Sequence, residues 1–322
     1  MLPRAFAQIP FAPGKWEGDK QVISHTRLFL FAATLASAIL SAPVVAKELT
    51  GTLKKIKDTG VISLGHRAAS IPFSYYDDKR QVIGYSQDLM LMVVEAVKAD
   101  LKLEKLAIKL LTVDSSNRMK LIEDGSVDLE CGSTTNNAER QQQVSFSNNI
   151  FVVETRLLTK ADSGINDFSD LAGRNVVTTA GTTSQRLLQE MNKDQKMNMS
   201  ISSAKDHNGA FLTLQTGRAV AFMMDDALLY GEMAKAKRPA DWVVVGTPQS
   251  REAYACMMRK DDQAFKKVVD KALAKAMKSG EAEKIYSKWF MQAIPPKGLN
   301  LNFPLSNALK AIYKSPNDKA FD

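Results

Sequence analysis

The spacing of apolar and polar residues along the chain predicts alternating strands and helices. Short apolar runs typical of strands are "GVISLGHR", "LAIKLLTV" and "DLECG", which lie between residues 60 and 132. Between them, residues 71–101 predict a turn region followed by an amphipathic helix, and "NRMKLIEDGSV" predicts a short helix. Strands and helices that alternate at this short spacing indicate an α/β domain with a mainly parallel sheet.

The same alternation begins again near residue 170. Residues 170–193 predict a loop, a strand, a Gly/Thr turn and a helix, and they are followed by "ISSAKDH", "AVAFMMDDALLYGEMAKA" and "DWVVVG". This stretch predicts a second α/β unit. After "AYACMMRK", residues 262–290 predict one long amphipathic helix that closes the folded body.

Composition places the chain among soluble globular proteins. Its 322 residues are 45% hydrophobic and 24% charged, and this length suits one large domain or two of ordinary size. A formal net charge of +8 and a pI near 9.3 raise the question of nucleic-acid binding. Basic and acidic residues alternate, however, as in residues 266–284, so a solvated surface is the better interpretation.

The first 46 residues predict a signal peptide with a doubtful N-terminal extension. Arg27 precedes the apolar run "LFLFAATLASAIL", and "SAPVVA" then offers small residues for cleavage after Ala46. Residues 1–24 do not fit this pattern, so we expect translation to begin nearer Val22. The mature protein should be exported, soluble and periplasmic.

Export changes what the two cysteines indicate. Cys131 and Cys256 are an even pair in an oxidising compartment, so we expect a disulfide, with two buried free thiols as the alternative. Neither cysteine belongs to a CxxC motif, and after Ala46 the chain keeps only His66 and His207. We therefore expect no metal and no cofactor.

Four segments, in order and at their spacing, carry a family resemblance over residues 50–290. They are "GYSQDLMLMVVEAV", "FSDLAGRNVVTTAGTTS", "GRAVAFMMDDALL" and "GEAEKIYSKWF". The chain resembles the periplasmic solute-binding proteins of ABC importers for polar amino acids. "GHRAASIPFSYYD", "ECGSTTNNAERQ", "SAKDH" and "IPPKGLNLNF" are similar to the members that bind acidic amino acids.

The resemblance implies a type II periplasmic-binding-protein fold with two lobes joined by two crossing hinge strands. Lobe 1 would comprise residues 47–152 and 252–322, and lobe 2 residues 153–251. Ligand, L-glutamate or L-aspartate, would be held between the lobes and passed to an ABC transporter membrane permease. We expect a monomer that binds no nucleic acid.

The loop "ECGSTTNNAER" is the first candidate site, because an amino-acid ligand brings a carboxylate that must be paired when it is buried. Small residues let backbone N–H groups and hydroxyls approach a carboxylate, and a guanidinium adds a bidentate partner. The family pattern implies that Ser133, Thr135 and Arg140 form this clamp. The alternative is a strand-to-helix turn capped by Asn136 or Asn137, with Arg140 on a solvated face.

The second half of the chain would supply the opposite wall. "AGTTSQ" precedes a predicted helix, and the free N–H groups of a helix N-terminus favour anions. Thr182 and Thr183 would therefore contact the same carboxylate, although an ordinary N-cap is also compatible with them. The resemblance places Asp225 against the ligand ammonium, and Asp226 beside it is a plausible N-cap instead.

The remaining candidates concern the ligand side chain. The family pattern assigns Arg67, Ser115 and Arg118 to this task, together with His207. Arginines beyond Arg140 would be uncompensated cations around a neutral amino acid, whereas a second ligand carboxylate would compensate them. The alternatives are a surface arginine at position 67 and a packed or solvated histidine at 207, and His66 receives no role.

Two other classes of protein compete with this interpretation. Some exported dehydratases use the same fold with a cleft carboxylate as acid and base, but the sequence offers no trustworthy Ser, His and Asp order and no metal-ligand spacing. A membrane receptor domain is disfavoured because no segment after the signal peptide is long and apolar enough to span a bilayer. We therefore expect a binding protein and not an enzyme.

Overall fold

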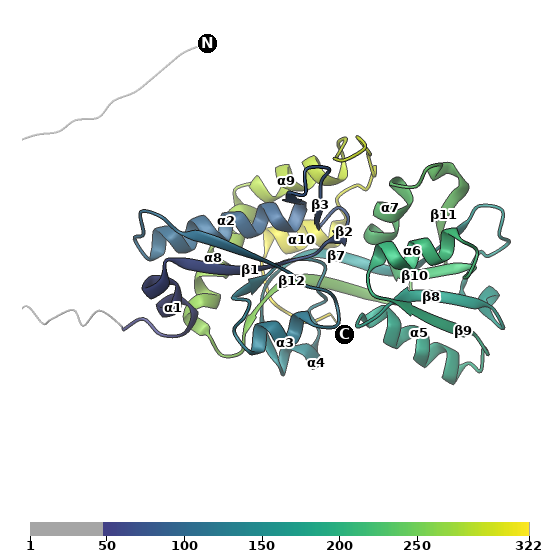
Figure 1. Cartoon of the computed structure of the whole chain (residues 1–322), viewed down its shortest axis with the longest axis horizontal. Coiled ribbons are helices and arrows are strands. Elements are labelled where there is room, and N and C mark those ends of the chain that lie inside the picture. Colours follow the sequence, from purple (N-terminus) through teal and green to yellow (C-terminus); the bar gives the residue numbers. More distant parts are fainter. Residues whose placement is uncertain (1–47, 322) are drawn as a thin grey trace, which may run out of the picture. The chain divides into compact units, whose positions relative to one another are not determined.

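The computed structural model describes residues 48–321 (Figure 1). The predicted signal peptide and its cleavage site lie outside the described residues. The helices are α1 Gly51–Thr59, α2 Tyr85–Asp100, α3 Arg118–Glu123, α4 Ala138–Gln141, α5 Thr183–Asp194, α6 His207–Gln215, α7 Asp226–Ala234, α8 Gln263–Lys278, α9 Glu281–Phe290 and α10 Asn307–Lys314, with 3-10 turns at Phe168–Leu171 and Pro239–Asp241. The strands are β1 Val61–His66, β2 Ala69–Ser70, β3 Ser74–Tyr76, β4 Val82–Ile83, β5 Ala107–Thr112, β6 Leu129–Glu130, β7 Val144–Lys160, β8 Asn175–Thr179, β9 Ser200–Ala204, β10 Ala221–Asp225, β11 Trp242–Val245 and β12 Arg251–Arg259.

Nine strands of the described residues form one sheet in the order β5-β1-β6-β12-β7-β10-β8-β9, and β11 also pairs with β7. β1 is parallel to β5 and β6, and β8 is parallel to β9 and β10. β12, β10 and β11 are antiparallel to β7. The strands predicted between residues 60 and 132 pair in parallel, as expected, and the long strand β7 and its partners add antiparallel pairs in the middle of the sheet.

β7 is the element that connects the two ends of the sheet. It is 17 residues long, pairs with β12 along its first part and with β10 and β11 along its second (Figure 1). The predicted lobe boundary falls inside this pairing, where Val153 lies opposite Glu252. The lobe division itself stays a prediction.

Local sequence explains the elements around β1. Five of the six residues of β1 are buried, as expected of a parallel strand covered on both faces. α2 begins after Gly84, whose φ is +135° and whose α-carbon lies so close to Phe73 that an added Cβ would sit 2.3 Å from the Phe73 carbonyl oxygen. Only glycine fits this junction. Leu89, Val93 and Val97 then line one buried face of the helix at helical spacing.

The long C-terminal helix predicted over residues 262–290 is two helices. α8 ends at Lys278, α9 begins at Glu281, and Gly280 between them has the left-handed φ of +80°. A glycine adopts this conformation without a Cβ clash and ends a helix readily. The amphipathic pattern continues across the break because both helices bury apolar residues, including Leu273 in α8 and Trp289 in α9.

The predicted disulfide is confirmed. Cys131 follows β6, Cys256 lies in β12, and their sulfur atoms are bonded at 2.08 Å with both residues fully buried. Among the described residues no cysteine is free. The bridge fastens the start of the loop "ECGSTTNNAER" to the strand that pairs with β7.

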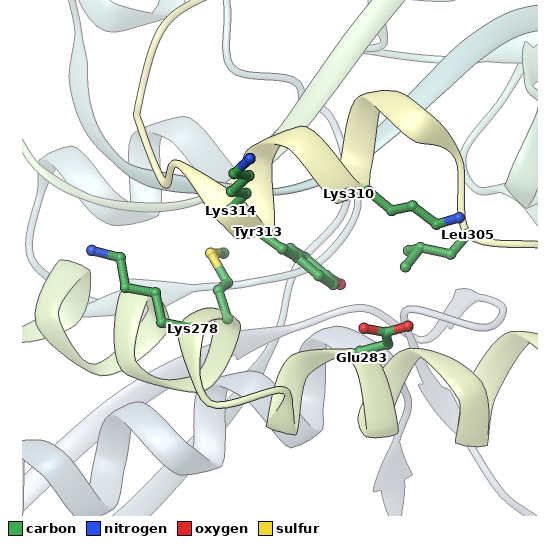
Figure 2. Close-up of a pocket in the computed structure, with 7 residues that line it drawn as sticks. Lys278, Glu283, Leu305, Lys310, Tyr313 and Lys314 are labelled. Atoms are coloured by element: carbon green, nitrogen blue, oxygen red, sulfur yellow. The ribbon is translucent and has the colours of Figure 1, made fainter. Parts of the chain in front are cut away.

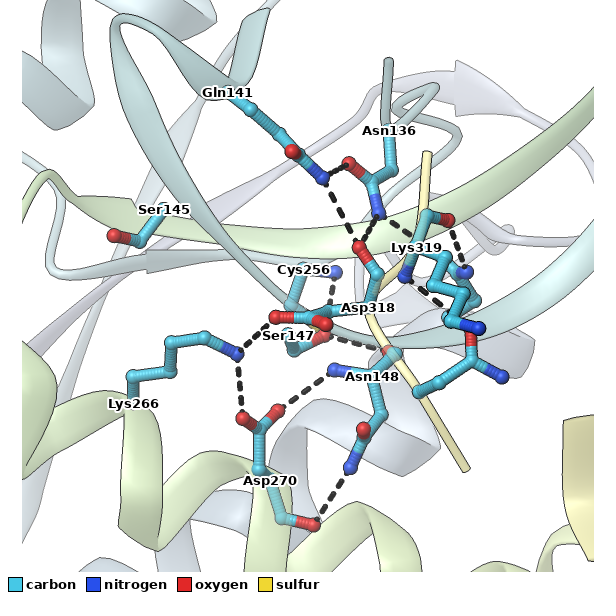
Figure 3. A network of polar contacts seen from close by, with 12 residues as sticks. Asn136, Gln141, Ser145, Ser147, Asn148, Cys256, Lys266, Asp270, Asp318 and Lys319 are labelled. Carbon is cyan, nitrogen blue, oxygen red and sulfur yellow. Dashed lines mark hydrogen bonds and ion pairs between the residues drawn. The ribbon is translucent and has the colours of Figure 1, made fainter. Parts of the chain in front are cut away.

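The segment after α10 lies against the start of β7 and the same loop (Figure 3). The backbone N–H of Asn149 donates to the carbonyl of Asn317 at 2.8 Å, and the side-chain amide of Asn136 donates to the carbonyl of Asp318 at 2.9 Å. The Asp318 carboxylate also pairs with Lys266 of α8 at 3.0 Å. The C-terminal segment is thereby tied to Asn136, which lies two residues before α4, the helix that contains Arg140.

Candidate functional site

Two predicted arginines meet in the interior. Arg67 follows β1 and is 2% exposed, and its Nη2 donates to the Ser115 hydroxyl at 2.9 Å while Nη1 lies 3.4 Å from the Ser133 hydroxyl. Arg118 begins α3, is also 2% exposed, and donates through Nη1 to the carbonyl of Ser133 at 3.0 Å and to the hydroxyl of Thr134. The structure therefore brings Arg67, Ser115, Arg118 and Ser133 together.

Burial and mutual repulsion act against the charges of this pair, and the buried carboxylate of Glu130 offsets part of their effect. Burial, followed by repulsion from Arg118, lowers the pKa of Arg67 to about 10, and burial also lowers the pKa of Arg118. Within residues 48–321, Nε of Arg118 has no hydrogen-bond partner, although the charge of Glu130 acts to raise the pKa of both arginines. Buried cations are stable only when they are paired, so this region suits an anionic group.

Arg140 extends from α4 toward the turn before α5. Its Nη1 donates to the carbonyl of Thr135 at 3.0 Å, and its Nη2 lies 3.5 Å from the carbonyl of Gly181. Burial and the charge of Arg118 lower its pKa to about 10. Gly181 has φ +73°, and an added Cβ would sit 2.8 Å from the backbone of Ser115. The turn before α5 therefore packs closely on the loop that contains Ser115. Arg140 of α4 thus reaches the turn before α5.

The two threonines of that turn have different partners. Thr182 is the N-cap of α5: its hydroxyl accepts from the backbone N–H of Gln185 at 3.1 Å and donates to the carbonyl of Thr179 at 2.7 Å. The hydroxyl of Thr183 donates instead to the carboxylate of Glu252 at 2.7 Å. The N-cap alternative therefore describes the hydroxyl of Thr182 and not that of Thr183.

Asp225 ends β10 and is 1% exposed. Its carboxylate accepts hydrogen bonds from the hydroxyl of Tyr254 and from that of Ser184, the latter at 3.3 Å. Burial and the nearby charge of Glu252 raise its pKa well above the usual range. The N-cap alternative for Asp226 was wrong, because Asp225 is the N-cap of α7 and Asp226 is its first residue. The carboxylate of Asp226 accepts from the backbone N–H groups of Ala227 at 2.7 Å and Glu154 at 3.2 Å.

His207 begins α6 and is 1% exposed. Its Nδ1 is 2.9 Å from the hydroxyl of Thr179, and its Nε2 has no hydrogen-bond partner among the described residues. Burial and the positive charges of Arg67 and Arg118 lower its pKa well below the usual value, so the imidazole is neutral. Asp206, the residue before His207, lines the same pocket as Arg67, so this imidazole lies in the part of the fold that contains the arginine pair.

Sequence reasoning missed two buried carboxylates. Glu130 is fully buried and accepts from the Thr134 hydroxyl at 2.8 Å, and Glu252 is 7% exposed. With Asp225 they equal the three site arginines in formal charge, and one positive charge remains when Asp225 is neutral. The sequence contained a signal for Glu252. It is the one acid in the otherwise apolar stretch "EAYACMM", two positions before Tyr254, so the two side chains lie on the same side of a strand.

Two pockets on the protein differ in the residues that line them, and one of them includes a predicted site residue. A pocket of about 280 Å³ is lined by Arg67 together with Ala68, Ala69, Thr112, Val113, Asp114, Asn117, Lys205 and Asp206. Another of about 340 Å³, between α8, α9 and α10, contains none of the predicted site residues and is lined by Met277, Lys278, Glu283, Leu305, Lys310, Tyr313 and Lys314 (Figure 2). The first pocket is the opening that belongs to the site.

Residues 48–321 contain no cluster of His, Cys, Asp and Glu side chains suited to holding a metal ion. No helix in that range is both long and apolar enough to cross a lipid bilayer.

Fold and site together define a class of protein. The chain belongs to the bacterial extracellular solute-binding proteins, family 3, whose model matches residues 62–292. It is 64% identical over 292 residues to the L-glutamate/L-aspartate-binding protein of Pseudomonas aeruginosa, a match that covers 90% of this chain and 97% of that protein. It is 55% identical over 293 residues to the glutamate/aspartate import solute-binding protein of Escherichia coli K12, with coverages of 91% and 97%.

A solved structure supports the same fold. An ancestral arginine-binding protein bound to arginine aligns with a TM-score of 0.65 at 26% identity, over 72% of this chain and 98% of that one. The predicted family membership and the type II binding-protein fold are confirmed.

Proposed function

We propose that this protein captures L-glutamate or L-aspartate and delivers it, chemically unchanged, to the membrane permease of an ABC importer. The buried pair Arg67 and Arg118 carries the proposal, because Glu130 is the buried carboxylate that acts on it most strongly and Nε of Arg118 still has no hydrogen-bond partner among the described residues. A dicarboxylic amino acid has a second carboxylate for this position, whereas a neutral amino acid would leave both guanidinium groups unpaired. The names and identities of the two relatives support the same ligands.

Each charged group of the ligand has its own set of proposed binding residues. Arg67, Arg118 and His207 hold the side-chain carboxylate, with Ser115 positioning Arg67 through its hydroxyl. Arg140 binds the α-carboxylate, supported by Ser133, Thr135, Thr182 and Thr183, and Asp225 faces the ammonium. A neutral His207 can donate from Nε2 to a carboxylate when its other nitrogen accepts from Thr179.

We further propose that the protein works in the periplasm, as a monomer, after removal of a signal peptide ending at Ala46. Residues 47–152 and 252–322 would move as one lobe and residues 153–251 as the other. The hinge would lie in β7 and β12 near Val153 and Tyr254. Contacts completed only when both lobes meet favour the closed state by their differential free energy.

Binding without chemistry distinguishes this function from that of an enzyme on the same fold. The relatives at 64% and 55% identity are named for binding and import, which supports a binding protein. Titration calorimetry of the mature protein against the twenty amino acids should give heat with glutamate and aspartate and little with glutamine or asparagine. Recovery of unchanged ligand after long incubation completes the test, and loss of ligand or tight binding of neutral amino acids would refute the proposal.

A further inference from the structure

One carboxylate links two predicted clamp residues that are far apart in the sequence. Oε2 of Glu252, on β12, accepts a hydrogen bond from the Thr135 hydroxyl at 2.6 Å and another from the Thr183 hydroxyl at 2.7 Å. Its other oxygen accepts from the hydroxyl of Ser250 at 3.0 Å. Thr135 belongs to the loop before α4 and Thr183 begins α5, so Glu252 holds two separate walls of the site.

These bonds decide what the two threonines can offer a ligand. A hydroxyl has one hydrogen and two lone pairs, and here both hydrogens point to Glu252. The oxygens of Thr135 and Thr183, which are 3.5 Å apart, can then only accept. A nitrogen donor at ordinary hydrogen-bond length could reach both, whereas a carboxylate would face two acceptors.

The hydroxyls of Tyr254 and Ser184, which lie close in sequence to Glu252 and Thr183, also donate to a carboxylate. Tyr254 lies two positions after Glu252, on the same side of β12, and donates to Asp225. Ser184, next to Thr183, donates to the other oxygen of Asp225 at 3.3 Å. Burial and the charge of Glu252 raise the pKa of Asp225, because two carboxylates share a dry region. A cation bound between them would relieve this repulsion.

We propose that Glu252 is the positioning residue that makes the Thr135 and Thr183 hydroxyls acceptors for the α-ammonium of the ligand. The inference rests on the proposed function and deepens it, since it moves these two hydroxyls from the α-carboxylate to the ammonium and leaves the α-carboxylate to Arg140. Glu252 thereby selects α-amino acids over dicarboxylates that lack an amine.

The test compares L-glutamate with glutarate, which has both carboxylates and no ammonium. Dissociation constants are measured by calorimetry, with displacement of glutamate for the weaker ligand. In Glu252→Gln, the glutarate-to-glutamate ratio of dissociation constants should fall at least tenfold, because only glutamate loses acceptors. Glu104→Gln is the control of the same chemistry: Glu104 is exposed in the connection between α2 and β5, and the ratio of this variant should equal that of the parent.

Each other result overturns the inference. Equal weakening of both ligands would mean that Glu252 only stabilises the fold, and stronger binding of both would mean that it competes with ligand carboxylates. A parent protein that binds neither glutamate nor aspartate would instead refute the proposed function.

Variants of the two threonines provide a measurement that needs no change at Glu252. Thr135→Val and Thr183→Val should each lower the same ratio. Adding Glu252→Gln to the double valine variant should change it no further, because the hydroxyls through which Glu252 acts are gone. An undiminished effect of Glu252→Gln in that background would contradict a role through the hydroxyls.

Discussion

Nη2 of Arg67 donates a hydrogen bond to the hydroxyl of Ser115 over 2.9 Å, although 48 residues separate them. The bond fixes the guanidinium beside Arg118 but does not neutralise it, since a hydroxyl carries no charge. The site therefore holds two positive charges in position before any ligand arrives. Mutating either arginine should change the affinity for ligands that carry a second carboxylate more than the affinity for neutral ones.

Arg118→Ala should lose most of its affinity for glutamate and aspartate without gaining strong binding of glutamine. Removing one partner of a buried charge pair costs about 2–5 kcal/mol, because the ligand carboxylate is left unpaired. Arg140→Ala should abolish binding of every α-amino acid. Calorimetry measures both effects, and Arg218→Ala on the exposed surface is the control. Parent-like glutamate affinity in both site variants would show that the site is misplaced.

Asp225→Asn should stabilise the unliganded protein at pH 7 while weakening ligand binding. Burial raises the pKa of Asp225, so its contribution to stability is present at low pH and is lost as pH rises from about 4 toward the raised value. The neutral amide avoids that loss, and each kcal/mol gained raises Tm by about 2–4 °C.

Melting curves of Asp225→Asn across pH check the sign. The gain in Tm over the parent should be largest near neutral pH and shrink toward pH 4, where the parent carboxyl is also protonated. Asp194→Asn, an exposed substitution of the same kind, should show no such trend. A gain that grows as pH falls would contradict the raised pKa.

Loss of the bridge between Cys131 and Cys256 should lower the free energy of unfolding by about 3–5 kcal/mol, since the disulfide closes a loop of 125 residues. The double serine variant in urea denaturation gives the value. The intact mass of unreduced mature protein confirms the bridge independently, and two titratable thiols in native material would refute it.

Closure around the ligand should make the molecule smaller. If β7 and β12 act as the hinge, the radius of gyration measured by small-angle X-ray scattering should decrease when glutamate saturates the protein. Arg140→Ala, which should not bind, serves as the control and should show no decrease. An unchanged radius for the saturated parent would argue against hinge closure.

Asn136→Ala should weaken both stability and ligand affinity. The Asn136 side chain is buried, donates to Asn149 and to the carbonyl of Asp318, and accepts from Gln141, so its removal leaves several of these groups unpaired (Figure 3). Each unpaired buried group costs about 1–3 kcal/mol. Thr135 next to it should lose its fixed position.

Urea denaturation and glutamate calorimetry measure the two effects of Asn136→Ala, and Asn208→Ala on the surface is the control. Unchanged glutamate affinity in a destabilised Asn136→Ala protein would separate the C-terminal segment from the binding site.

The sequence by itself determined the family, the α/β class and most elements, because apolar periodicity and short motifs are local properties. It also identified Arg67, Arg118 and Arg140 as a set, since each lies in a short segment of recognisable composition. The disulfide followed from export and an even cysteine count. These inferences needed no knowledge of which residues are neighbours in space.

Only the tertiary structure decided which side chains of the site are hydrogen-bonded to one another. Glu252 lies 117 residues from Thr135 and 69 from Thr183, and no periodicity in the sequence links an acid on one strand to hydroxyls on two distant loops. The antiparallel centre of the sheet and the break at Gly280 also depended on how elements pack. A hydrogen atom points to whichever acceptor folding brings near, so the polarity of each hydroxyl in the site is a property of the fold.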